Sequence, residues 1–125
     1  MLDKCPATAV LVAKDLDRAK KFYQEKLGLK LRQGPEGVII FEAGNGTTVA
    51  LYQKEGGSKA IHTVLAFEVN HLEEVLQTLK SQGVEQDMDG LPEGANEQGI
   101  VSYGPVKSAW IKDSEGNIIA LNQMG

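Results

Sequence analysis

The chain has 125 residues with 42% hydrophobic and 24% charged side chains, a composition typical of one globular domain, and it is too short for two independent cores. Its thirteen basic and seventeen acidic residues leave a net charge of −4, which provides no basic surface for nucleic acid. No apolar run reaches the roughly eighteen residues needed to cross a bilayer, and Asp3 and Lys4 interrupt an N-terminus that has no signal-peptide core. We therefore expect a single domain, residues 1–125, in the cytoplasm, with neither nucleic acid nor a membrane as partner.

The sequence contains two copies of one pattern. Residues 8–30 can be aligned with residues 62–85, so that Leu16 matches Leu72 and, after a one-residue gap, Gly28 matches Gly83. Residues 46–53 match residues 116–123 without a gap. This repeat predicts two homologous modules, about 1–55 and 60–125, joined by a linker at residues 54–60.

The first module begins with an apolar run at residues 7–13 that predicts a strand. A helix follows, with Asp15 as its N-cap, Gly28 as its left-handed C-terminal residue, and one apolar face formed by Leu16, Ala19, Phe22, Tyr23 and Leu27. Residues 29–33, 37–44 and 47–54 have the composition of strands, and the turn Gly44, Asn45, Gly46 predicts a hairpin between the last two.

The second module repeats this order. Residues 62–69 predict a strand, Asn70 and Glu73 have the spacing of a capping box, and the following helix buries Leu72, Val75, Leu76 and Leu79. Strands are expected at residues 84–88, 106–113 and 117–123. Residues 89–105 are rich in Gly, Pro and Asn, which indicates a long loop of the kind that is often functional. The sequence therefore predicts an α+β protein built from two βαβββ modules.

The segments KDLDRAKKFYQEKLGLK at residues 14–30 and IKDSEGN at residues 111–117 resemble the vicinal oxygen chelate superfamily. That group includes glyoxalase I, extradiol dioxygenases, fosfomycin-resistance enzymes, methylmalonyl-CoA epimerase and bleomycin-resistance proteins. The resemblance implies that the two modules form a strongly curved mixed sheet around a cavity, within a homodimer. It also implies a divalent metal held by His, Glu or Gln side chains on the first and last strand of each module.

The four positions that correspond to the family's metal ligands carry Thr8, Ala50, Val64 and Ala120. Thr8 lies seven residues before Asp15, and Val64 lies at the same offset from His71. A single neutral hydroxyl among alanines and a valine cannot hold a divalent cation against water. We therefore expect a cavity without a metal or other cofactor, and no catalytic residues.

Five further side chains are candidates for the lining of this cavity. In glyoxalase-like relatives an aromatic residue at the place of Trp110 lines the substrate pocket, and Tyr103 stands where the family has an aromatic on a covering loop; burial in the core is the alternative for Trp110. Tyr52 shares the strand face of Ala50, and Asn122 shares that of Ala120. His62 lies two residues before Val64, where it is either a displaced ligand or base or, more commonly, a solvated rim residue.

Three functions compete on these grounds. The leading hypothesis is a metal-free protein that binds and sequesters an apolar or aromatic small molecule, as bleomycin-resistance proteins do with their drug. The alternative is a metal-dependent lyase, isomerase or dioxygenase of the glyoxalase type, with a displaced metal site formed by His62 with Glu42 or Glu68. The third is a module that binds a protein partner through an exposed apolar patch.

Overall fold

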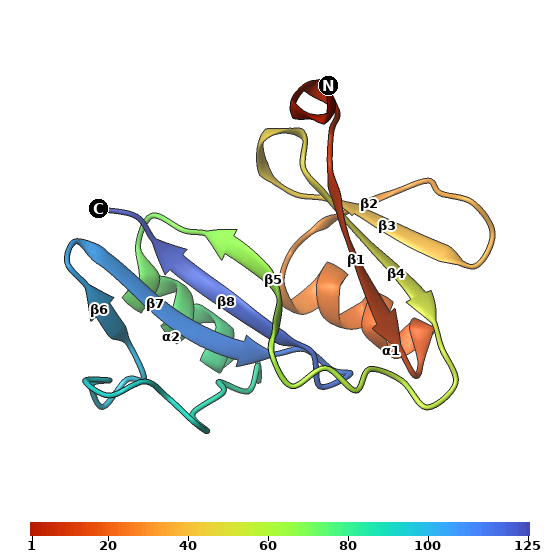
Figure 1. Ribbon diagram of the computed structural model, residues 1–125. Helices are drawn as coiled ribbons and strands as arrows, with labels where there is room; N and C mark the ends of the chain where they lie inside the picture. The colour runs from red at the N-terminus through yellow and green to blue at the C-terminus, as the bar shows by residue number, and fades with distance from the viewer. The chain divides into compact units, whose positions relative to one another are not determined.

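The computed structural model describes residues 1–125 and divides them into two compact modules, Met1–Lys59 and Ala60–Gly125. Each module has the order strand, helix, strand, strand, strand, so the α+β class and the two predicted βαβββ units are confirmed (Figure 1). The division falls at the end of the predicted linker. Each module contains its own four-stranded sheet with mixed strand directions.

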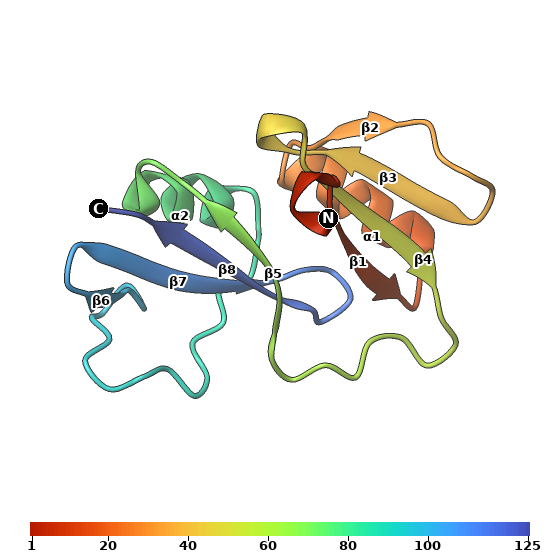
Figure 2. The same ribbon diagram turned by 45° about the horizontal axis from the view of Figure 1, so that its top comes forward.

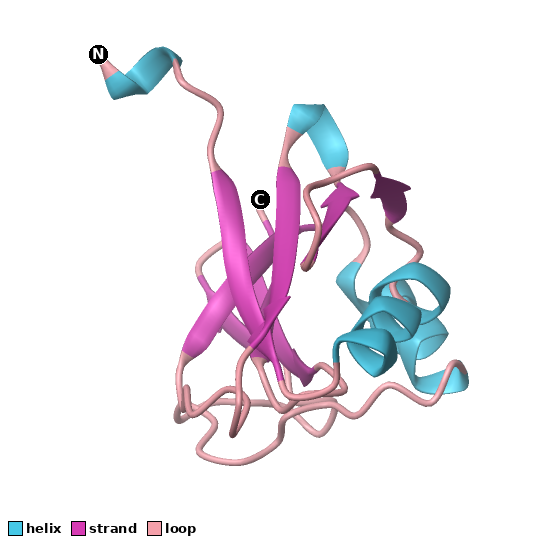
Figure 3. Cartoon of the chain, turned by 90° about the vertical axis from the view of Figure 1, so that its right-hand side faces the viewer, coloured by secondary structure: helices cyan, strands magenta, loops and turns pink.

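The N-terminal module has the strand order β1-β4-β3-β2, with β1 parallel to β4 and the other neighbours antiparallel. One face of this sheet is covered by α1, and the short helical turn η1 extends the chain before β1 (Figures 2 and 3). The elements are η1 (Leu2–Lys4), β1 (Thr8–Ala13), α1 (Leu16–Lys21), the π-helical turn η2 (Phe22–Lys26), β2 (Lys30–Arg32), β3 (Val38–Glu42), the turn η3 (Gly44–Gly46) and β4 (Thr48–Gln53).

The predicted limits of the first helix are confirmed by its hydrogen bonds. Asp15 is the N-cap, and its Oδ1 accepts a hydrogen bond from the backbone N–H of Arg18 at 3.0 Å. Gly28 ends the helical segment with φ at +72°, a left-handed conformation that residues with a Cβ adopt at a cost. The ring of Tyr23 is fully buried and stacks on Phe41 of β3 with ring centroids 5.9 Å apart, which joins helix and sheet.

The C-terminal module has the strand order β5-β8-β7-β6, with β5 parallel to β8. Its elements are β5 (Thr63–Glu68), α2 (Leu72–Ser81), β6 (Val101–Tyr103), β7 (Val106–Lys112) and β8 (Ile118–Gln123). Helix α2 packs on β7 and β8, where Leu72 and Leu79 meet a core that includes Ile111, Ile119 and Leu121. Neither this helix nor α1 has the length and apolar character that crossing a membrane requires.

The predicted capping box at the start of α2 is wrong. The N-cap is His71 rather than Asn70, and no side chain of the cap accepts a hydrogen bond from the first turn. Instead Gln123 of β8 accepts a hydrogen bond from the backbone N–H of Leu72 at 2.9 Å, while Glu73 forms an ion pair with Lys107 of β7 at 3.2 Å. A side chain from a strand about fifty residues away therefore accepts from a free N–H group at the start of α2, in place of the predicted cap Asn70.

The strands after α2 also differ from the expectation. Residues 84–88, predicted as a strand, form only the isolated bridge Gln86 to Ile111. The predicted loop 89–105 contains β6, which pairs with the first residues of β7. Both segments pair with the same edge of β7: β6 with its first residues, and Gln86 with Ile111 near its end. Tertiary pairing decides such short strands more strongly than their composition does.

Candidate functional site

The face of the C-terminal sheet opposite α2, which we call the open face of this module, contains the side chains of interest. Successive residues of β7 alternate between the two faces. Ala109 and Ile111 are fully buried, and Ile111 lies with Leu76 and Leu79 of α2. Trp110, between them, therefore projects from the open face, where it is half-buried. The tryptophan is not packed beneath the helix.

On the β8 side of Trp110, the open face carries small side chains. In the strand register Trp110 pairs with Ala120 of β8, and Ala120 pairs with Ala66 of β5. The two alanines leave the indole ring without a bulky neighbour along this row. A flat ring presented beside small side chains suits stacking against a flat ligand.

The next row across the open face is polar. Asn122 pairs with Glu68 on one side and Ser108 on the other, and the Ser108 hydroxyl donates to Asn122 Oδ1 at 2.8 Å. Glu68 is exposed. This places the Glu68 side chain on the same face as Ala66, two residues before it in β5. The row brings a carboxamide and a carboxylate next to the apolar row of Trp110.

A tight turn holds β7 and β8 in this register. The buried carboxylate of Asp113 accepts hydrogen bonds from the backbone N–H of Glu115 and from both the backbone N–H and the side-chain Nδ2 of Asn117, all at 2.8 Å. Gly116 adopts φ of +84° between them. The role of the IKDSEGN segment, residues 111–117, is therefore structural: its hydrogen bonds fix the register that places Trp110 opposite Ala120.

A hollow of about 230 Å³ lies beside Trp110 and within the C-terminal module. It is bounded by the residues between the linker and β5, by the segment after α2, by Trp110 of β7 and by Ile118 at the start of β8. The exposed His62 precedes β5 in a bend and contributes to its wall. The lining residues are Ile61, His62, Thr63, Asp87, Asp89, Gly90, Leu91, Pro92, Trp110 and Ile118.

Of these lining residues only His62 and Trp110 were among the candidates from sequence, and the two carboxylates, Asp87 and Asp89, were missed. They fall at the border between a predicted strand and a predicted loop, so their orientation could not be assigned there. The backbone N–H of Asp87 donates to the carbonyl of Trp110 at 2.8 Å, which fixes Asp87 beside the tryptophan. Gln86 and Met88 line the hollow on the α2 side of the sheet and Asp87 lines the one beside Trp110, as alternation along an extended segment requires. The sequence shows this alternation, but only the pairing with β7 shows which face each side chain is on.

Strand β5 contains an irregularity at Val64. Thr63 pairs with Ile118 and Leu65 pairs with Ile119, so two residues of β5 are opposite one step of β8. Counting back from His71 selects Val64 as the counterpart of Thr8, whereas the strand pairing selects Thr63. Alternation also cannot be continued from Val64 to His62, because His62 lies outside the strand.

Tyr103 lies away from the hollow. It pairs with Val106, the first residue of β7, whereas Trp110 is near the other end of that strand. Its side chain is 54% exposed and is not part of the wall around Trp110. The structure therefore brings His62 and Trp110 together, keeps Asn122 and Ala120 on the same face, and separates Tyr103 from them.

The three candidates in the N-terminal module share the sheet face opposite α1. Ala50 pairs with Val10 and Ile40, and Tyr52 pairs with Val12 and Val38. Thr8 pairs with Thr48, and the two hydroxyls form a hydrogen bond. Tyr52 is 39% exposed, so its ring is accessible on this face.

The residues at the inherited metal positions do not fit a divalent cation. In the N-terminal module they supply one hydroxyl, which already bonds to Thr48, and a methyl group. In the C-terminal module Ala120 has no donor, and neither Val64 nor its register alternative Thr63 has an imidazole or carboxylate. Nowhere in the chain do three or more His, Cys, Asp or Glu side chains gather closely enough to hold a metal ion.

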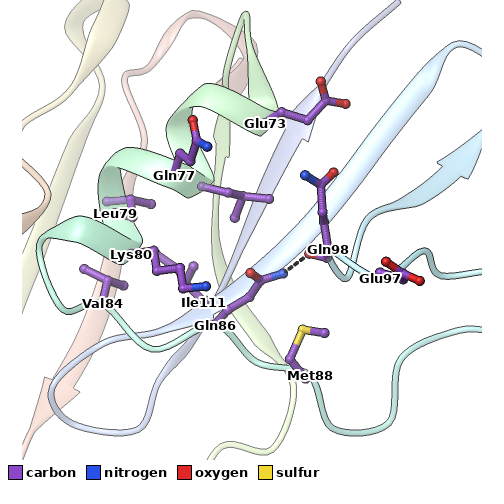
Figure 4. Close-up of a pocket in the computed structure, with 11 residues that line it drawn as sticks. Glu73, Gln77, Leu79, Lys80, Val84, Gln86, Met88, Glu97, Gln98 and Ile111 are labelled. Carbon is purple, nitrogen blue, oxygen red and sulfur yellow. Dashed lines mark hydrogen bonds between the residues drawn. The ribbon is translucent and has the colours of Figure 1, made fainter.

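A larger hollow, of about 500 Å³, lies on the other side of the C-terminal sheet, between α2 and the segment that follows it (Figure 4). Leu79 and Ile111 contribute apolar walls, and the Gln86 side chain closes one part by donating to the Gln98 carbonyl at 2.5 Å. None of the candidate residues lines it, and it has no aromatic side chain. We therefore place the candidate site at the smaller hollow, where the tryptophan lies.

The family model of the Glyoxalase/Bleomycin resistance protein/Dioxygenase superfamily matches residues 6–121. The chain belongs to this superfamily. None of the curated proteins matches the chain.

Solved structures agree with this membership at the level of the fold. TnmS3, an antibiotic binding protein from Streptomyces sp. CB03234, is 21% identical with a TM-score of 0.75 over 100% of this chain and 99% of its own. A glyoxalase family protein from Bacillus anthracis is 21% identical, with a TM-score of 0.74 over 98% and 96%. Lactoylglutathione lyase from Agrobacterium tumefaciens is 16% identical, with a TM-score of 0.70 over 96% and 93%. Binding proteins and enzymes therefore share this fold, so the function of this chain has to be argued from the residues at its site.

Proposed function

We propose that this superfamily member is a metal-free protein that binds, and thereby sequesters, an apolar or aromatic small molecule. The observation that carries the proposal is the placement of Trp110 on the open face of the C-terminal module, beside Ala120 and Ala66 and at the wall of a hollow of about 230 Å³. Ligand pockets typically have volumes of about 300–1,000 Å³, so this hollow has room for one end of a drug-sized molecule.

The absence of ligand side chains at the inherited positions supports binding over metal-assisted chemistry. A Lewis-acid mechanism needs imidazole or carboxylate groups that leave open positions on the ion, and Thr8, Ala50, Val64 and Ala120 supply none. The likeness in fold to TnmS3, described as an antibiotic binding protein, is consistent with this proposal. We propose that the ligand of this chain is a small molecule with a flat, largely apolar part.

A homodimer is part of the proposal. In each module one edge strand, β1 or β5, pairs with a neighbour on only one side. Val10 of β1 is 63% exposed, and Ile61 before β5 is also exposed. Unpaired strand edges and exposed branched side chains are features that a second copy of a chain commonly covers.

The experiment that tests binding uses the sole tryptophan as its reporter. We would titrate a library of aromatic metabolites and antibiotics and follow the fluorescence of Trp110, then measure each hit by calorimetry. Saturable binding that weakens in Trp110→Ala supports the proposal. A true ligand that binds Trp110→Ala as tightly as the wild type would refute this site, and turnover that requires an added metal would favour the enzyme hypothesis.

A further inference from the structure

Asp87 stands directly opposite Trp110 on the open face of the C-terminal module. The bridge between Gln86 and Ile111 sets an antiparallel register in which Asp87 comes opposite Trp110, and the Asp87 N–H donates to the Trp110 carbonyl at 2.8 Å. Gln86 and Ile111 line the hollow beneath α2, whereas Asp87 and Trp110 line the smaller one. Residues opposite each other in this way have Cβ atoms about 4.5–5.5 Å apart.

The Asp87 carboxylate is poorly compensated by the protein. The residue is only 9% exposed, its Oδ1 accepts one hydrogen bond from the backbone N–H of Asp89 at 3.2 Å, and Oδ2 accepts none. No lysine or arginine forms an ion pair with it. Because no buried side-chain oxygen in the structure lacks a hydrogen-bond partner, Oδ2 reaches solvent, and the hollow is the direction from which a positive charge can approach it.

Asp89, the second carboxylate of the hollow, is partly balanced. Lys112 of β7 places its Nζ 3.9 Å from Asp89 Oδ2, and the Asp89 side chain is 95% exposed. His62, the remaining ionisable side chain of the wall, is exposed at the rim. The unbalanced negative charge inside the hollow therefore belongs to Asp87.

We propose that the small molecule bound at this site carries a positively charged nitrogen, such as a protonated amine, held between the Asp87 carboxylate and the face of Trp110. A carboxylate and an indole ring attract a cation together, because the ring face is electronegative and both groups are partly shielded from water. Leu91, Pro92 and Ile118 provide apolar walls for the remainder of the ligand. This inference rests on the proposed binding function and specifies its ligand class as organic cations.

The first experiment compares two probes of nearly equal shape, naphthylmethylammonium and the uncharged naphthylmethanol. Binding is followed through the indole N–H signal of Trp110 in two-dimensional NMR, which is a single resonance because the chain has one tryptophan. We expect the cation to bind at least about tenfold more tightly, a difference equivalent to about 1.4 kcal/mol. Equal affinities would overturn the charge proposal and leave the binding function standing, whereas no response to either probe or to the aromatic library would overturn both.

The second experiment assigns the preference to one carboxylate. Asp87→Asn preserves an oxygen that can accept from the Asp89 N–H, and it should remove most of the preference for the cation while leaving binding of naphthylmethanol within about twofold. Glu74→Gln removes the same charge from an exposed residue of α2, on the other face of the sheet, and should leave the preference unchanged. A preference that survives Asp87→Asn, or that falls equally in Glu74→Gln, would contradict a local role for Asp87.

Discussion

The turn between β7 and β8 provides a quantitative test of how the site is positioned. Asp113→Ala removes the acceptor of three hydrogen bonds of 2.8 Å, two of them from Asn117, which is 1% exposed. A buried donor left without a partner costs about 1–3 kcal/mol. Because water can reach part of the emptied turn, we expect the free energy of unfolding of the protein to fall by about 2–4 kcal/mol.

The assay is urea unfolding followed by the fluorescence of Trp110, the one tryptophan of the chain, which lies next to this turn on β7. Asp113→Asn retains one acceptor oxygen but presents an amide N–H₂ toward the Asn117 side chain, so we expect an intermediate loss. Ser114→Ala is the matched control, because its hydroxyl bonds only to the neighbouring Glu115 carboxylate, and its effect should stay within about 0.5 kcal/mol. If Asp113→Ala lies as close to the wild type as this control, the turn does not hold the hairpin as argued.

Three further predictions concern metal content, binding and assembly. The purified protein should lack stoichiometric Zn, Ni, Mn or Fe by elemental analysis, because the inherited positions offer no imidazole or carboxylate; one tightly held metal per chain that is lost in His62→Ala would favour the enzyme hypothesis. Trp110→Ala should weaken a confirmed ligand about tenfold or more in calorimetry, since losing about 1.4 kcal/mol of contact has that effect; unchanged affinity would mean that the ring lies outside the site. Light scattering should give a homodimer at micromolar concentration, and a monomer there would contradict the role proposed for the strand edges.

Local patterns in the sequence were sufficient for most of the architecture. The internal repeat predicted two βαβββ modules, the Asp15 cap and Gly28 marked the limits of the first helix, and period-two alternation put Asn122 on the face of Ala120. The cap and the alternation depend on residues within a few positions of one another, and the helix end depends on a backbone conformation that glycine favours. The repeat is a comparison of such local patterns between the two halves of the chain. The offset from His71 gave Val64 as the counterpart of Thr8, whereas the strand register gives Thr63, because β5 has an irregularity at this point.

The arrangement around Trp110 was decided by contacts between segments far apart in the chain. Gln123 of β8 replaces the expected capping box of α2, the irregularity at Val64 shifts β5 against β8, and residues after α2 share the edge of β7 with β6. Asp87 illustrates the consequence: no local pattern indicates whether its carboxylate faces α2 or the open face, since a shift of one residue in pairing would reverse it. The sequence alone therefore determined the two modules, and only the tertiary pairing with β7 placed a buried carboxylate beside the tryptophan.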